Sequence, residues 1–251
     1  MKIATFGSCL SRYIGNNYTY LFGGKIVSSV YHNRSDIFVE RFIDKVAGQL
    51  THHDIADKLV AQKIDTPIES KAEVILSNQY ADSIGKHRLN NGVQFIDLLE
   101  SKKVDLVILD NYMDLGAKLM SVDGTMPGSK WFIRPNDLKD PSACRPGSFL
   151  PPEQGVQSML TLIKQIQLMV PKAKVVFCNF PHNTYHAFPE RVERTRQYEK
   201  IISSKADGSF ALIPSIAVPE RFQTHEKQHF KKEMYCGYAG IIRSLDLVGI
   251  K

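Results

Sequence analysis

The sequence predicts a single three-layer α/β domain, in which a doubly wound parallel sheet of about five strands lies between two layers of helices. Two observations predict this fold class. Short apolar runs recur along the chain, and segments with helical periodicity separate them. The runs are apolar throughout rather than alternating, which is typical of parallel strands that are covered on both faces.

The predicted strands are short and rich in aliphatic or β-branched side chains. They are Lys2–Phe6, Lys25–Val30, Asp105–Leu109, Lys174–Cys178 and Phe210–Ile213. After the first strand, Leu10, Tyr13 and Ile14 follow Gly7-Ser8-Cys9 at helical spacing. The chain therefore begins with a strand, a tight turn and a helix.

Later helices are predicted from apolar stripes, and the first of these stops at Pro171. The stripes are Val156, Met159, Leu160, Ile163, Ile166 and Val170; Val192, Thr195, Tyr198, Ile201 and Ile202; and Met234, Tyr238, Ile241, Ile242 and Leu245. The region 116–152 is rich in Gly, Pro, Ser and Asp and lacks periodicity, so we expect a lid or an insertion there. Residues 1–251 are otherwise expected to form one domain, because this length suffices for one substantial core.

Composition indicates the cellular location of the protein and the class of its partners. The sequence shows neither a signal peptide nor a membrane span, and its four cysteines lie far apart without metal-ligand spacing. A cytoplasmic protein with reduced thiols, and with no metal, is expected. The net charge of +6 favours an anionic partner, but no long basic block indicates nucleic-acid binding. Oligomeric state is left open.

The turn Gly7-Ser8-Cys9 is the first candidate for chemistry, because the carboxyl ends of parallel strands form the ligand crevice of such sheets. A thiol at a helix N-terminus is favoured as the thiolate, which is the nucleophilic form. The alternative is structural, with Cys9 a small buried hydrophobe and Ser8 a helix cap. The sequence also lacks P-loop, dinucleotide-binding and zincin motifs.

The stretch ATFGSCL resembles block I of the SGNH or GDSL-like hydrolases, in which Gly-Asp-Ser-Leu ends an apolar strand and the serine is the nucleophile. In this resemblance Cys9 takes the nucleophile's place and Ser8 stands where the aspartate would be. The start is also similar to families related to bacterial polysaccharide biosynthesis, which carry GSC or GNC there. Because Ser8 and Cys9 are adjacent, either is a candidate nucleophile, and Cys9 is the preferred one.

Two further segments resemble blocks of the same superfamily. Glu226 and His229, ahead of the last helix, match block V, so the resemblance implies that His229 is the base and Glu226 its orienting carboxylate. His225 is the rival base. Asn111 matches the oxyanion-binding asparagine of block III, with a plain turn after the strand as the alternative. Block II expects a glycine after the second strand, where Tyr31-His32-Asn33 stands instead, so a second oxyanion donor is unassigned.

A thiol, a histidine base and an oxyanion donor together predict acyl transfer through a covalent acyl-enzyme. The resemblance implies a carbohydrate O-acyltransferase or esterase of capsule or other polysaccharide biosynthesis, acting on a carbohydrate or another acylated small molecule. No cofactor is required by this chemistry, and acyl-coenzyme A is one candidate donor. The alternative is a noncatalytic module that binds a carbohydrate or an anion on a decayed site.

Overall fold

The computed structural model describes residues 1–46, 71–79, 93–121, 130–132 and 145–247. A parallel five-stranded sheet forms its centre, with the order β2-β1-β3-β6-β7. These strands span Lys2–Gly7 (β1), Lys25–Tyr31 (β2), Leu106–Asp110 (β3), Lys174–Cys178 (β6) and Ala211–Ile213 (β7). The predicted fold class and all five predicted strands are confirmed, and no strand end differs from its predicted position by more than one residue.

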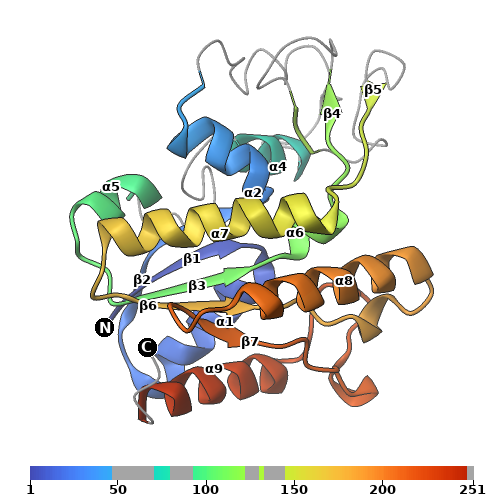
Figure 1. Ribbon diagram of the computed structural model, residues 1–251. Helices are drawn as coiled ribbons and strands as arrows, with labels where there is room; N and C mark the ends of the chain where they lie inside the picture. Colours follow the sequence, from blue (N-terminus) through green and yellow to red (C-terminus); the bar gives the residue numbers. More distant parts are fainter. Residues whose placement is uncertain (47–70, 80–92, 122–129, 133–144, 248–251) are drawn as a thin grey trace, which may run out of the picture.

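Helices cover both faces of the sheet (Figure 1). Helices α1 (Cys9–Phe22) and α9 (Lys232–Leu247) pack against each other on one face, and α7 (Pro152–Met169) and α8 (Pro189–Lys205) pack against each other on the opposite face. Most residues of their predicted apolar stripes are buried, whereas Leu160, Val192, Ile201 and Leu245 are partly buried and Ile241 of α9 is exposed. Hydrophobic burial of these stripes against the sheet supplies the main stabilisation of the domain.

Shorter elements complete the described chain. They are α2 (Ser35–Phe38), the π-helix η1 (Val39–Ile43), α4 (Lys71–Gln79), α5 (Phe95–Glu100), α6 (Tyr112–Gly116), the 3₁₀ turns η4 (Asn183–Tyr185) and η5 (Glu220–Phe222), and the small antiparallel pair β4 (Met120–Ser121) and β5 (Arg145–Pro146). The sequence predicted none of them as regular elements. Most of the predicted insertion, 122–129 and 133–144, lies outside the described residues.

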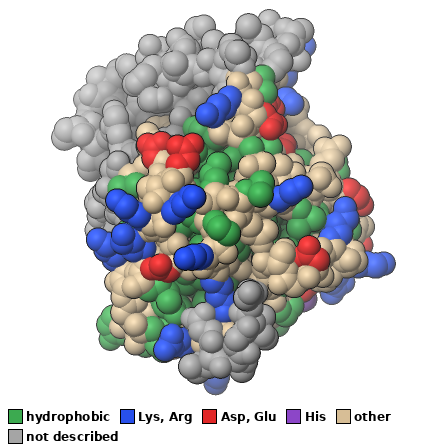
Figure 2. Space-filling model, turned by 60° about the vertical axis from the view of Figure 1, so that its left-hand side comes forward, with side chains coloured by type: hydrophobic (Ala, Val, Ile, Leu, Met, Phe, Trp, Pro, Cys, Tyr) green, Lys and Arg blue, Asp and Glu red, His purple; other side chains and the backbone are tan. Residues whose placement is uncertain are grey.

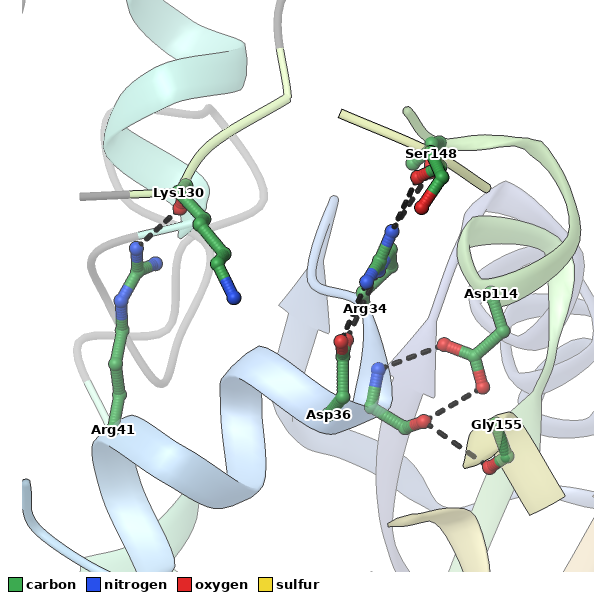
Figure 3. Close-up of polar contacts among 9 residues, drawn as sticks. Arg34, Asp36, Arg41, Asp114, Lys130, Ser148 and Gly155 are labelled. Carbon is green, nitrogen blue, oxygen red and sulfur yellow. Dashed lines mark hydrogen bonds and ion pairs between the residues drawn. The ribbon is translucent and has the colours of Figure 1, made fainter. Parts of the chain in front are cut away.

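Two buried arginines after β2 hold chain segments beyond the sheet (Figure 3). Arg34 pairs with Asp36 and donates from Nη1 to the carbonyl oxygens of Ala117, at 3.2 Å, and Ser148, at 3.5 Å. Arg41 donates to the carbonyl oxygens of Gln79 and Lys130, at 2.7 Å each. A planar guanidinium presents several donors in fixed directions, so one side chain satisfies several buried carbonyls.

The surface at the amino ends of the strands carries both hydrophobic and charged side chains. Figure 2 shows Lys and Arg side chains distributed among hydrophobic ones on this face. Within the described residues, no helix combines the length and the apolar character that a membrane crossing requires.

The strand order places a topological switch point between β1 and β3. From β1 the chain first moves outward to β2 and then returns to the other side of β1 for β3. In sheets with this order, ligands bind outside the carboxyl ends of the two strands at the switch point. Gly7 ends β1, and Ser8 and Cys9 follow it. Asp110 ends β3, and Asn111 follows it. The predicted turn and Asn111 therefore both lie at this crevice.

Candidate active site

The turn after β1 is held by the carboxylate of Asp110, the last residue of β3. Asp110 Oδ2 accepts hydrogen bonds from the backbone N–H of Ser8 at 2.8 Å, the hydroxyl of Ser8 at 3.0 Å and the backbone N–H of Ser11 at 2.9 Å. Its Oδ1 accepts from the backbone N–H of Tyr112 at 3.0 Å. Complete burial raises the pKa of Asp110, and these hydrogen bonds oppose that rise.

Gly7 allows this close contact between the two strand ends. Its φ of +129° lies in the region that L side chains rarely adopt, and a Cβ there would come within 2.6 Å of the Asp110 carbonyl oxygen. Only glycine therefore fits at this position of the motif without strain, because the end of β3 approaches the turn so closely.

Ser8 and Cys9 have different environments. Ser8 caps α1, because its hydroxyl oxygen accepts from the backbone N–H of Leu10 at 3.1 Å, and its side chain is buried against Asp110. Cys9, the first residue of α1, is partly exposed and takes part in no disulfide. The structure thus uses Ser8 as a capping residue and leaves Cys9 as the accessible thiol of the turn.

Tyrosines from three elements interact electrostatically with Cys9. Tyr31 ends β2, Tyr112 begins α6, and Tyr235 lies in the first turn of α9. Burial raises the pKa of each phenol, and electrostatic interaction with Cys9 raises it further. The end of β2, the segment after β3 and the start of α9 therefore each provide a phenol within electrostatic range of the Cys9 thiol.

His229 and Glu226 form a hydrogen-bonded pair in the loop before α9. Glu226 Oε2 contacts His229 Nδ1, and the backbone N–H of His229 donates to the Glu226 carbonyl at 2.9 Å. The Thr224 hydroxyl tightens the same loop by donating to the carbonyl oxygens of Glu226 and His229, at 2.9 Å each. With Nδ1 directed to the carboxylate, Nε2 is the nitrogen left to exchange a proton. His225, the rival base, is exposed.

Two tyrosines connect this loop to the helix that begins at Cys9. The Tyr13 ring, one helical turn after Cys9, lies 5.9 Å from the His229 ring and 5.2 Å from the Tyr235 ring, measured between centroids. The Tyr235 hydroxyl accepts from the backbone N–H of Phe230 at 2.9 Å. Because residues i and i+4 of a helix share a face, Cys9 and Tyr13 lie on the same face of α1.

Asn111 and His32 have positions that the sequence did not predict in detail. Asn111 is fully buried, donates from Nδ2 to Asn179 Oδ1 at 3.3 Å and accepts from the Phe180 backbone N–H at 2.8 Å. It therefore joins the ends of β3 and β6, and its role as an oxyanion donor stays a prediction. His32 follows β2 with φ of 58°, the left-handed conformation that favours glycine, where the resemblance expects one.

Asp110 is the residue of this site that sequence reasoning missed as a functional group. A buried carboxylate that binds the backbone of a turn distant in the sequence has no local signature. Only the pairing of β1 with β3 brings the two together. No group of three or more His, Cys, Asp or Glu side chains within the described ranges is arranged to hold a metal ion.

A separate pocket of about 540 Å³ lies between η4 and the start of α8. Its lining consists of His182, Asn183, His186, Pro189, Val192, Glu193 and Arg196. None of the predicted catalytic residues contributes to it.

Comparisons with known proteins found no matching family model and no matching curated protein. Among solved structures, a carbohydrate esterase family 2 enzyme with a carbohydrate-binding domain from Corynascus thermopiles (Myceliophthora fergusii) is similar at a TM-score of 0.47 and 10% identity, over 99% of this chain and 66% of that one. A family two carbohydrate esterase from Clostridium thermocellum, in complex with cellohexaose, is similar at 0.40 and 10%, over 100% and 65%. An acetyl xylan esterase from Butyrivibrio proteoclasticus is similar at 0.35 and 10%, over 100% and 65%. The chain spans about two thirds of the length of these proteins.

Proposed function

We propose that this protein cleaves acyl esters of carbohydrates, or transfers an acyl group to a carbohydrate, through a thioester on Cys9. The single observation that supports this proposal best is a series of contacts that links the His229 loop to the start of α9 and to Cys9. The His229 imidazole, paired with Glu226, lies against the Tyr13 ring, and the Tyr13 ring lies against that of Tyr235. Tyr235 interacts electrostatically with the partly exposed thiol of Cys9. A nucleophile, a base and an orienting carboxylate are the parts that covalent acyl transfer requires.

The proposed reaction has two balanced steps. His229 Nε2 takes the thiol proton as Cys9 Sγ bonds to the ester carbonyl carbon, and the carbonyl oxygen becomes negatively charged. This intermediate collapses, the C–O bond to the alcohol breaks, and the departing alcohol oxygen takes the proton from His229. In the second step, His229 deprotonates an acceptor hydroxyl, which attacks the thioester and releases the thiol.

The acceptor decides the class of enzyme. Water makes the protein an esterase, and a sugar hydroxyl makes it an O-acyltransferase, for which acyl-coenzyme A is one candidate donor. The carbohydrate substrate and the link to polysaccharide biosynthesis rest on the resemblance of the Gly7-Ser8-Cys9 stretch.

Intact-protein mass spectrometry after mixing with p-nitrophenyl acetate tests the covalent step. We expect an acetyl adduct on the wild type and on Ser8→Ala, none on Cys9→Ala, and removal of the adduct by neutral hydroxylamine, which cleaves thioesters readily and oxygen esters slowly. An adduct that persists in Cys9→Ala and disappears in Ser8→Ala would identify a serine enzyme. Absence of an adduct and of turnover with every variant would favour a noncatalytic module.

A further inference from the structure

Two arginines near the start of α8 lie beside the candidate active site. The guanidinium carbon of Arg191 is 3.7 Å from the centre of the Tyr185 ring and 4.9 Å from that of Tyr112. The two tyrosine hydroxyls are hydrogen-bonded at 3.0 Å. Arg191 and Cys9 both interact electrostatically with Tyr112, so the cation and the thiol share this residue as a neighbour.

The guanidinium of Arg191 has no acidic partner among the described residues. Its Nε and Nη2 are buried and make no hydrogen bond there. Such groups are uncommon because a buried N–H without an acceptor costs free energy, and a guanidinium normally pairs with a carboxylate or phosphate. Gly116 permits the position, since a Cβ on that residue would lie 2.5 Å from Arg191 Nη1.

Arg194 adds a second cation on the same side of the helix. Its guanidinium carbon is 3.8 Å from the centre of the Phe149 ring, and Nη2 donates to the Leu115 carbonyl at 3.2 Å. Its Nε is buried without a partner within the described residues. Burial and the positive charge of Arg191 lower its pKa, and the exposed Glu190 raises it. Two adjacent guanidinium groups repel each other, and an anion placed between them relieves that repulsion.

We propose that Arg191 and Arg194 form a subsite for a negatively charged group of the substrate, a phosphate or a carboxylate carried by the sugar or its donor. Both arginines lie near the carboxyl ends of the strands. The reason is that α6, which comes after β3, and the start of α8 lie side by side there (Figure 1). The subsite rests on the proposed function only for its role in turnover.

Equilibrium binding tests the subsite without turnover. Isothermal titration calorimetry on Cys9→Ala protein compares glucose, glucose 6-phosphate and glucuronate, with inorganic phosphate as a fourth probe. We expect at least one charged sugar to bind more tightly than glucose by roughly tenfold or more, as charge-assisted hydrogen bonds predict. The two charged sugars distinguish phosphate from carboxylate.

Variants assign the effect to the arginines. In the Cys9→Ala background, Arg191→Gln is expected to abolish the preference for the charged sugar, and Lys200→Gln, which removes an exposed charge from the same helix, is expected to keep it. Arg194→Gln serves as the second variant if Arg191→Gln lowers the melting temperature strongly. Equal binding of charged and neutral sugars by the parent protein, or an unchanged preference in both arginine variants, would overturn the subsite.

The two proposals fail separately. Charge-dependent binding without any acyl adduct on Cys9 would leave the subsite standing and refute the acyl-enzyme. An acyl adduct on Cys9 together with equal binding of charged and neutral sugars would support the acyl-enzyme and refute the subsite.

Discussion

The buried carboxylate of Asp110 binds the backbone N–H of Ser8 at 2.8 Å, and this contact joins the end of β3 to the turn after β1. Through it, the last residue of β3 helps to fix the position of Cys9, the residue that follows Ser8 and begins α1. The stability of the turn and the reactivity of Cys9 are therefore expected to change together when this contact is altered.

Replacement of Asp110 tests that connection. Asp110→Asn has too few acceptor sites for the four donors that the carboxylate binds, so it is expected to lower the free energy of unfolding by about 1 to 3 kcal/mol and to reduce turnover. Urea unfolding and ester hydrolysis provide the two measurements. Asp105→Asn is the control, because this carboxylate accepts from Lys2 at the opposite, exposed end of the same strand pair. Equal effects of the two substitutions would contradict the role of Asp110.

Gly7 is expected to tolerate no side chain. Gly7→Ala combines a φ of +129° with a contact of 2.6 Å to the Asp110 carbonyl, so we expect a loss of roughly 3 kcal/mol or more. Gly23→Ala separates the two causes, because Gly23 also has a positive φ, +80°, but nothing lies within 4 Å of its Cβ position. Gly23→Ala should cost only about 1 kcal/mol in the same urea titration. A Gly7→Ala loss as small as that of Gly23→Ala would show that crowding by Asp110 is unimportant.

The base is expected to be His229 and not His225. His229→Ala should lower kcat by roughly 100-fold or more, as loss of a general base does, whereas His225→Ala should leave kcat near the wild-type value. Glu226→Gln should give a smaller loss than His229→Ala, because the imidazole remains but loses its orienting carboxylate. Steady-state hydrolysis of an activated ester measures all three. A larger loss for His225→Ala than for His229→Ala would exchange the two assignments.

Thiol reactivity gives a measurement that does not depend on a substrate. Iodoacetamide is expected to label Cys9 much faster than Cys178, because Cys178 is fully buried and burial raises the pKa of its thiol. Peptide mass mapping of a time course gives the rate at each cysteine. Labelling of Cys9 should slow in His229→Ala if the imidazole takes the thiol proton, and an unchanged rate there would argue against that contact.

Asp114 is expected to make stability depend on pH. Burial raises the pKa of Asp114 to about 7, although hydrogen bonds from Ser35 lower it (Figure 3). The nearby Asp36 raises this pKa further, and Arg34 lowers it. The native state then binds more protons than the unfolded state between about pH 4 and 7, so stability is greatest at low pH and falls as pH rises, by at most about 1.4 kcal/mol per pH unit.

Asp114→Asn removes that proton, so its free energy of unfolding should rise relative to the wild type between pH 5 and pH 8. Urea titrations at the two pH values measure the difference. Asp97→Asn, at an exposed site, is the control. If the difference between Asp114→Asn and the wild type stays constant across this range, the buried carboxylate does not titrate there.

The sequence by itself determined the parallel α/β architecture, because buried strands and amphipathic helices leave local patterns in the apolar residues. It also singled out Cys9, since a tight turn between a strand and a helix is visible in a short window, whereas the roles of Glu226 and His229 came from the resemblance to block V of the SGNH hydrolases. The helices between residues 35 and 100 escaped prediction because they are short and mix buried polar side chains with apolar ones.

Only the tertiary structure decided how these groups are used. The capping role of Ser8, the partial exposure of Cys9 and the full burial of Asn111 depend on which strand ends meet at the switch point. Asp110 and Arg191 acquire their partners from elements distant in the sequence, β1 and α6, and no local pattern records such contacts. Periodicity follows from the geometry of one element, whereas the environment of a side chain follows from the packing of several.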